Sequence, residues 1–192
     1  MDLLTTLGRT LGFSFAAGVN LYATVAIMGL ASRYQWVALP EQFRIFDNKW
    51  IIGAALAMYV VEFVADKIPW VDSVWDAVHT VIRPAGAALI AVASIGHARP
   101  EVQAAAALAG AALASSSHFA KAGTRVAANT SPEPFSNWIL SLSEDGFVIA
   151  LGVLALTHPI AAAVIVIAGV AVILASASWL WKKLKNRRKR RR

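Results

Sequence analysis

The residues of this 192-residue chain that could do chemistry are ionisable side chains at helical intervals. Four of them are separated by four, three and four positions and so share one face of a helix: Asp72, Asp76, His79 and Arg83. Glu62 and Asp66 stand four positions apart just before them, across a break that Pro69 predicts. Two helix ends therefore present carboxylates, a histidine and cations to one small volume.

A comparable set follows in the second half of the chain. Polar residues again recur every three or four positions on one predicted helix: His118, Lys121, Arg125 and Asn129. The segment 129–134, which contains Glu133 and two prolines, predicts a break. The helix after it carries polar residues on a shared face: Asn137, Ser141, Glu144 and Asp145.

Three kinds of site fit these residues. Asp72, Asp76 and His79 could ligate a divalent cation from one helix face, although no standard ligand motif is present. The carboxylates and His79 could equally relay protons, because histidine titrates near neutral pH. Lys121 and Arg125 could instead hold a phosphate through charge-assisted hydrogen bonds.

A purely structural interpretation is also open. The first set is acid-rich and the second begins with cations, so the two could pair as an ion-pair network that joins the halves. A ligand site and such a network can coexist. The chain has no nucleophile-plus-base motif, glycine-rich nucleotide loop or zinc signature, so an enzyme is less favoured and no resident cofactor is expected.

The composition is that of a membrane protein. Hydrophobic residues make up 58% of the chain and charged residues only 15%, with a mean hydropathy of +0.59. The net charge is +7, but nine of the 18 Lys and Arg residues lie in 182–192, which leaves nine against eleven acids in 1–181, a charge of −2. We therefore do not expect a nucleic-acid partner. The absence of cysteine excludes disulfides and a cysteine nucleophile.

We predict an all-α polytopic membrane protein with about six transmembrane helices, each near the 20 residues that a crossing needs. The predicted spans are 10–31, 50–67, 71–96, 102–122, 135–157 and 160–181. Four spans would follow if the third and fifth helices only dip into the bilayer. The segments 50–96 and 102–157 are two helical hairpins with proline-broken polar segments, which form a possible internal repeat with a site between them.

The basic tail sets the expected orientation. Nine positive residues directly after the last span place the C-terminus in the cytoplasm, and six crossings place the N-terminus there as well. We predict a transmembrane domain over 1–181 and a cytoplasmic tail over 182–192, in the bacterial inner membrane. The tail should contact anionic lipids, and a homo-oligomer is possible. Asn20, within the first span, is expected to hydrogen-bond another helix.

Three runs of the sequence resemble an uncharacterised bacterial integral-membrane family, the domain of unknown function 4126. The runs are Gly18–Thr24, Val61–Thr80 and Lys121–Asn137, and the resemblance extends over nearly the whole chain short of the tail. It implies a small multi-pass bacterial membrane protein and supplies no activity. From the residues, the favoured function is a transporter or channel-like permease that moves an ion or small solute. The alternatives are a flippase or phosphatase-like protein that binds a lipid phosphate, and a structural subunit of a membrane complex.

Overall fold

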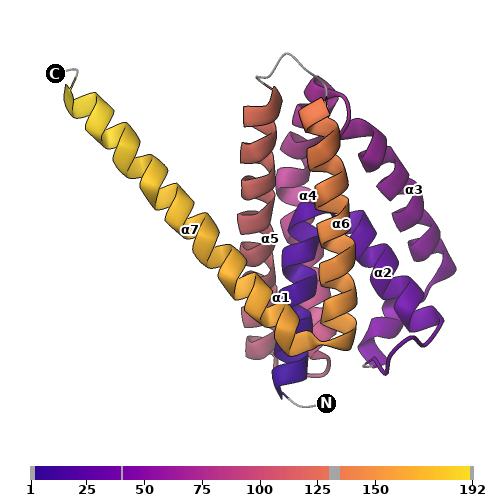
Figure 1. Ribbon diagram of the computed structural model, residues 1–192. Helices are drawn as coiled ribbons and strands as arrows, with labels where there is room; N and C mark the ends of the chain where they lie inside the picture. Colours follow the sequence, from indigo (N-terminus) through magenta and orange to yellow (C-terminus); the bar gives the residue numbers. More distant parts are fainter. Residues whose placement is uncertain (1–2, 40, 130–134, 191–192) are drawn as a thin grey trace.

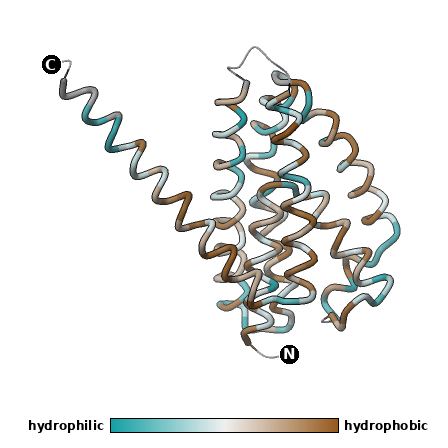
Figure 2. The backbone as a smooth tube through the Cα atoms, viewed as in Figure 1, coloured by the Kyte–Doolittle hydropathy of each residue, from teal (hydrophilic) through white to brown (hydrophobic). Residues whose placement is uncertain are grey.

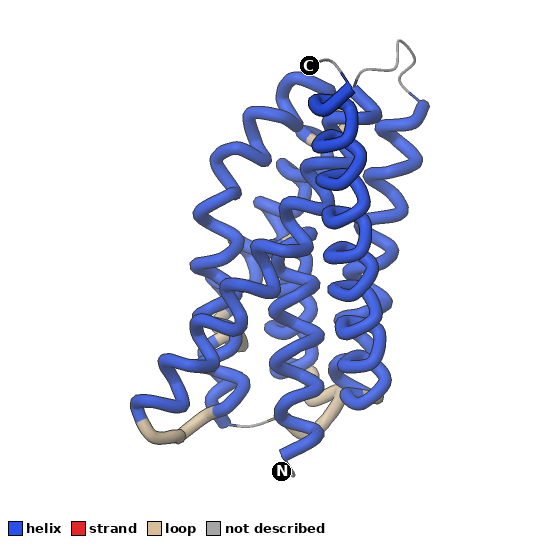
Figure 3. Tube along the Cα trace, turned by 90° about the vertical axis from the view of Figure 1, so that its left-hand side faces the viewer, coloured by secondary structure: helices blue, strands red, loops and turns tan. Residues whose placement is uncertain are grey.

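The computed structural model describes residues 3–39, 41–129 and 135–190, and nearly all of them are helical (Figure 3). In chain order the helices are α1 (Leu3–Val19), α2 (Leu21–Arg33), the 3-10 helix η1 (Glu41–Ile45), α3 (Lys49–Ala65), α4 (Pro69–Ile95), α5 (Pro100–Asn129), α6 (Phe135–Thr157) and α7 (Pro159–Arg190). The described residues contain no strand, which confirms the all-α prediction.

Helix α1 is the central helix, and it packs against α4, α5, α6 and α7 (Figure 1). Small residues allow this close packing. A Cβ atom added to Gly12 would lie 2.8 Å from the Cβ atom of Ala155 on α6, and one added to Gly18 would collide with the backbone of Ala114 on α5. Phe13 belongs to the apolar core and is fully buried.

The chain breaks at Asn20, between α1 and α2. Asn20 has an extended backbone, with φ of −146° and ψ of 102°, and its side chain accepts a hydrogen bond of 2.9 Å from the Ala23 N–H. This is the geometry of a helix N-cap, which asparagine favours. α2 then runs back toward the end where α1 began (Figure 1), and Arg9 of α1 donates to the carbonyl of Ala38, just after α2.

The predicted single span over 10–31 therefore differs from the structure. α1 has 17 residues and α2 has 13, so their lengths are about 26 and 20 Å at 1.5 Å per residue. Each is shorter than a hydrocarbon core of about 30 Å. The pair enters the bundle and returns to the same end, and we call it the re-entrant pair.

The helices α3 to α7 run alternately up and down the bundle, and the α3–α4 turn lies at the same end as the start of α6 (Figures 1 and 3). Pro69, Pro100 and Pro159 are the first residues of α4, α5 and α7. Proline suits this position because the first N–H of a helix has no partner within the helix. α4 continues as one helix through Pro84.

Three of the described helices are long and apolar enough to cross a membrane, over Trp70–Ile95, Phe135–Thr157 and Pro159–Lys183. This indicates a membrane protein. The first two correspond to the predicted third and fifth spans, 71–96 and 135–157. The last residues of α3 and of α5 lie at the same end of the bundle (Figure 1).

Helix α7 packs against α1 only through its first half and then projects away from the bundle (Figure 1). Its apolar part and its hydrophilic end are distinct in Figure 2, and it continues as one helix through residues 182–190. Gly8, near the start of α1, lies against Pro159, where α7 begins. The start of α1 and the end of α7 are therefore at opposite ends of the bundle. The sequence predicts both termini on one side, whereas here they lie at opposite ends, because the re-entrant pair returns to the end where α1 begins.

Candidate functional site

Ionisable side chains from α3, α4, α5 and α6 are buried together in the half of the bundle that contains the α3–α4 turn. We call this set the buried network, and it consists of Glu62, Asp66, Asp72, Asp76, His79, Arg83, His118, Lys121, Arg125 and Asp145, with Glu144 partly exposed at its edge. The stripe predicted on α4 is thus a buried face. Val74, Val78 and Val81 are exposed on the rest of that helix.

Arg83 joins α3, α4 and α5. Its Nη2 donates to Glu62 Oε1 at 2.7 Å, and its Nη1 donates to Asp76 Oδ1 at 3.0 Å. The same Nη1 lies 2.7 Å from Nδ1 of His118. Arg83 and Glu62 have no exposed side-chain area, so this ion pair is fully desolvated. The attraction within such a pair offsets the cost of desolvation only when the geometry is good and further hydrogen bonds reach both charged groups.

Lys121 and Arg125 of α5 hold the carboxylates from the other side. Lys121 Nζ donates to Asp66 Oδ2 at 2.9 Å and to Glu62 Oε1 at 3.4 Å. Arg125 Nη2 donates to the same Asp66 oxygen at 3.1 Å, and its Nε donates to both carboxylate oxygens of Glu144 at 3.2 Å. Asp72 lies 3.7 Å from Arg125 Nη1. The acid-rich and cation-rich halves of the sequence therefore pair directly.

Both buried histidines have two polar neighbours that fit a neutral ring. His79 Nδ1 lies 2.7 Å from the Trp75 carbonyl, which can only accept, so Nε2 is left to accept from the Tyr22 hydroxyl at 2.9 Å. His118 Nδ1 faces the Arg83 guanidinium, which can only donate. Its Nε2 therefore donates to Thr80 Oγ1 at 3.0 Å.

The re-entrant pair ends in the network. The last carbonyls of α1 lack partners within the helix. Val19 O accepts from Lys121 Nζ at 3.3 Å, and Gly18 O is 3.5 Å from Arg83 Nη1. On α5, Ser117 donates to the Phe15 carbonyl at 2.8 Å. The cations that hold the carboxylates thus also hold the negative end of the α1 dipole.

Asn20 links the helix break to α6. Its Nδ2 donates to Asp145 Oδ1 at 3.2 Å, which confirms that this isolated polar residue bonds another helix. Because its Oδ1 already accepts from Ala23, the orientation of the amide is fixed. Glu144 and Asp145 are sequence neighbours that point to different partners, Arg125 and Asn20.

Lys67 lies in the turn between α3 and α4. Its Nζ donates to the Phe63 carbonyl at 2.9 Å and to Ser141 Oγ at 3.4 Å. Partial burial lowers the pKa of Lys67 below its ordinary value, and the carboxylates Asp145 and Asp66 oppose this shift.

Two pockets flank the network. One, of about 210 Å³, lies between α4 and α5, and its lining includes Asp72, Asp76, His118 and Arg125. The other, of about 290 Å³, lies among α1, α5, α6 and α7, and its surface is mostly apolar, with Lys121 and Glu144 as the charged residues of its lining. The charged side chains thus form ion pairs with one another, and the network borders a pocket on each of two sides.

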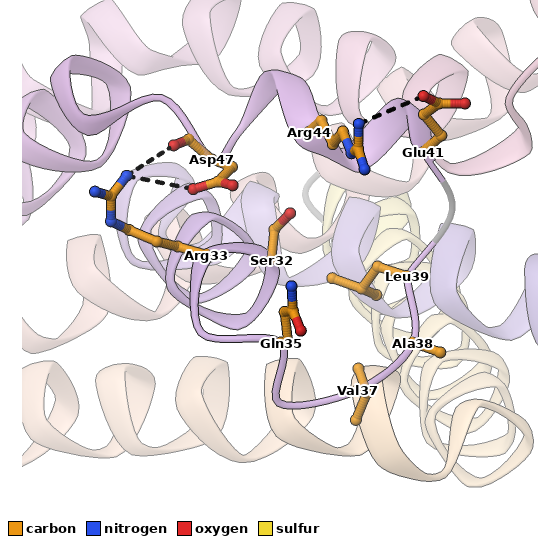
Figure 4. Close-up of a pocket in the computed structure, with 9 residues that line it drawn as sticks. All are labelled: Ser32, Arg33, Gln35, Val37, Ala38, Leu39, Glu41, Arg44 and Asp47. Atoms are coloured by element: carbon orange, nitrogen blue, oxygen red, sulfur yellow. Dashed lines mark hydrogen bonds and ion pairs between the residues drawn. The ribbon is translucent and has the colours of Figure 1, made fainter.

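A larger pocket, of about 850 Å³, lies at the opposite end of the bundle beside the loop that joins α2 and α3 (Figure 4). Its lining includes two ion pairs, Arg33–Asp47 at 3.4 Å and Arg44–Glu41 at 3.6 Å. All four of these side chains are exposed, so the pocket lacks the desolvated charges of the network.

Some predicted site residues fall outside this description. Glu133 lies outside the described residues, and only the backbone of Asn129 is described, as the last residue of α5. Asn137 is buried on the same face of α6 as Asp145. Within the described part of the chain, no group of three or more His, Asp or Glu side chains is placed to hold a metal ion, so we do not assign one to Asp72, Asp76 and His79.

Sequence reasoning missed two aromatic residues of the site. Tyr22 bonds His79, and the Trp75 ring stacks on the His79 ring with 4.5 Å between centroids. Trp75 stands four positions before His79, a helical neighbour that could have been considered. Tyr22 follows the break at Asn20 and reaches the site only because α2 turns back, a reversal that a hydropathy pattern does not reveal.

The family comparison matches residues 7–183 to the family described as "Domain of unknown function (DUF4126)". The chain belongs to the DUF4126 family. This confirms the resemblance found in the sequence. No curated protein and no solved structure matches this DUF4126 member. Its function therefore has to be argued from the network and its surroundings.

Proposed function

We propose that this protein is a small multi-pass membrane transporter or channel-like permease that moves an ion or small solute. The observation that carries the proposal is the buried network at the tip of a re-entrant helix pair. Ionisable groups at membrane depth are costly and typically mark an ion or substrate path. Discontinuous helices whose ends meet buried charges are a common way for transporters to build such sites.

The surface supports a position across the bilayer. Exposed tryptophans lie near both ends of the bundle: Trp36 and Trp50 at one end, and Trp70 and Trp138 at the other. Tryptophan prefers the two membrane interfaces. Between them, α7 exposes large apolar residues such as Val164 and Val172, which water would not tolerate as an extended patch.

The basic tail supports an orientation with the α3–α4 turn toward the cytoplasm of a bacterial inner membrane, because positive segments remain inside. With this orientation Lys67 and the cations of the network lie toward the cytoplasmic side. The tail residues would contact anionic lipid headgroups, an attraction of about 1 kcal/mol per basic residue near the surface.

The charge of the network favours a cationic species. With the histidines counted as neutral and Lys67 included, the described residues of this region contain six carboxylates and four cations, which leaves two negative charges. The carboxylates are Glu62, Asp66, Asp72, Asp76, Glu144 and Asp145, and the cations are Lys67, Arg83, Lys121 and Arg125. A buried site tends toward neutrality because uncompensated charge is expensive in a low-dielectric environment. Protons or small cations would supply the balance.

The pocket between α4 and α5 supplies an approach to this site. It brings Asp72 and Asp76 next to His118 and Arg125, at the edge of the ion pairs. A cation that enters there meets Asp76, whose other contact is Arg83. The cation would replace Arg83 as the partner of Asp76 and could then move on to Glu62, the other carboxylate that Arg83 holds. This exchange of ion-pair partners would not require the whole bundle to open.

A lipid-phosphate protein is the second candidate, and the apolar groove that ends at Lys121 and Glu144 favours it. It has less support than transport. Lys121 and Arg125 are already engaged by Asp66 and Glu144, so a phosphate would have to displace carboxylates.

Reconstitution tests the transport proposal. The purified protein is placed in liposomes with a trapped pH dye or cation dye, and flux is driven by a potassium diffusion potential. We expect flux of at least one tested cation or of protons above that of protein-free liposomes, and at least a tenfold reduction in Asp76→Asn. Glu41→Gln, in an exposed ion pair at the other end of the bundle, is the matched control and should retain wild-type flux.

Helical content and elution in detergent establish that each variant is folded. Wild-type protein that moves none of the tested ions, or an Asp76→Asn protein with unchanged flux, would rule the proposal out. Co-purification of a stoichiometric anionic lipid that is lost in Lys121→Ala would favour the second candidate instead.

A further inference from the structure

Asp145 differs from the other carboxylates of the network. Each of the other five lies within 4 Å of a cationic side chain, by the pairs Arg83–Glu62, Arg83–Asp76, Lys121–Asp66, Arg125–Asp72 and Arg125–Glu144. Asp145 has no ion-pair partner in the described part of the chain, and its one hydrogen bond comes from the neutral amide of Asn20. It is nevertheless 94% buried.

The second oxygen of Asp145 is also unsatisfied. Oδ2 is buried and accepts no hydrogen bond within the described part of the chain. Glu62 Oε2 and Asp66 Oδ1 are buried without a hydrogen bond in the same way. A buried carboxylate normally receives several hydrogen bonds, and one that has no ion-pair partner and an oxygen without a hydrogen bond prefers its neutral form.

Charged groups surround Asp145 on several sides. Glu62 of α3 and Asp66, the C-cap of that helix, act on it as like charges. Lys121 of α5 acts as an opposite charge, and Asn20 of the break donates to it. Further out are Tyr59 of α3 and Lys67 of the turn. Lys121 is already shared by carboxylates of α3 and α6. The surroundings of Asp145 are thus net acidic.

We propose that Asp145 is the proton-binding carboxylate of this protein and that Asn20 positions it at the helix break. The proton adds to Oδ2 and turns the carboxylate into a carboxylic acid, which removes one of the two excess negative charges. Asn20 can donate to Oδ1 in both protonation states. This inference rests on the proposed function in that it names a proton as the bound cation.

The arrangement favours a proton over a metal ion. No group of three or more His, Asp or Glu side chains in the described part of the chain is placed to hold a metal ion, whereas a proton needs only one free oxygen. The location also matters for function. Because Asn20 is both the N-cap of α2 and the partner of Asp145, the charge of Asp145 acts directly on the residue where the chain reverses.

Infrared difference spectroscopy across a pH titration tests the proposal without any transport measurement. Wild-type protein in lipid should show the C=O stretch of a protonated carboxyl that disappears as the pH is raised. Asp145→Asn should lose this titrating band, and Asp76→Asn should retain it. Asp145→Glu, which keeps a carboxyl, should also retain a band.

Asn20→Ser provides a second variant that keeps Asp145 and an N-capping side chain. Loss of the amide donor removes a hydrogen bond that stabilises the carboxylate, so the band should persist to higher pH than in wild type. A band unchanged in Asp145→Asn, or a wild type without any titrating carboxyl band, would overturn the proposal. A band lost in Asp145→Asn together with no flux in liposomes would reject transport but leave Asp145 as the protonated residue.

Discussion

The two ends of the bundle solve the same electrostatic problem in different ways. In the half that contains the α3–α4 turn, Arg83 forms an ion pair with Glu62, and both side chains are fully buried. At the opposite end, Arg44 pairs with Glu41 beside a large open pocket, and the side chains are 78% and 79% exposed. Water screens the second pair and makes it nearly neutral for stability, whereas the first pair must satisfy its charge within the protein. Charge and a pocket therefore mark a site only where the charge is also desolvated.

The largest loss of stability is expected when the cation of the buried ion pair is removed. Arg83→Met should destabilise the protein by about 3–5 kcal/mol, because it leaves Glu62 and Asp76 buried without their common cation. Arg44→Met should change stability by less than about 1 kcal/mol. Thermal or denaturant unfolding in detergent measures both. Equal losses in the two variants would show that burial does not distinguish the two ends.

A second comparison concerns the helices that enclose the network. A Cβ atom at Gly18 would collide with the Ala114 carbonyl and the Ser117 hydroxyl, where α1 meets α5 just before the break. A Cβ atom at Gly53, in the second turn of α3, has no neighbour within 4 Å in the described structure. Gly18→Ala should therefore cost about 1–3 kcal/mol through overpacking, and Gly53→Ala should be neutral or stabilising by up to about 1 kcal/mol.

Unfolding measurements on these two single variants suffice for this test. They also report on the site, because a shift of α1 relative to α5 moves the Val19 carbonyl away from Lys121. If Gly18→Ala proves as stable as Gly53→Ala, the close approach of α1 to α5 is not required.

Much of the site followed from spacing alone. The intervals between Asp72, Asp76, His79 and Arg83 predict one face, and that face is buried toward α3 and α5. The pairing of acid-rich and cation-rich segments was an open alternative in the sequence, and the structure realises it. Such inferences succeed because helical periodicity and charge complementarity are local or additive properties that single sequences carry.

The re-entrant pair could not be obtained in this way. The segment 10–31 is apolar, long enough to cross and free of proline, so its pattern predicts one helix. The reversal depends on Asn20 capping α2 while bonding Asp145, a residue 125 positions away. Asparagine is a favoured helix N-cap residue, but only the long-range partner determines where α2 goes.

The smallest expected effect is a change in the pH dependence of stability caused by Lys67, which lies at the edge of the network. Because burial lowers the pKa of Lys67, the folded chain releases this proton at a lower pH than the unfolded chain. Within the window between that lowered value and the ordinary value near 10.5, the unfolded state binds more protons, so this residue makes stability rise with pH. Lys67→Met should remove that rise and make the dependence of stability on pH flatter.

Unfolding midpoints measured in lipid or detergent at about pH 8 and about pH 10 test this sign. Lys49→Met, at the exposed start of α3, controls for the general loss of a positive charge. If Lys67→Met instead lost more stability relative to wild type at about pH 8 than at about pH 10, Lys67 would be acting as a charged partner of Asp66 and Asp145. The network would then extend through the turn and would include Lys67 as a fourth structural cation.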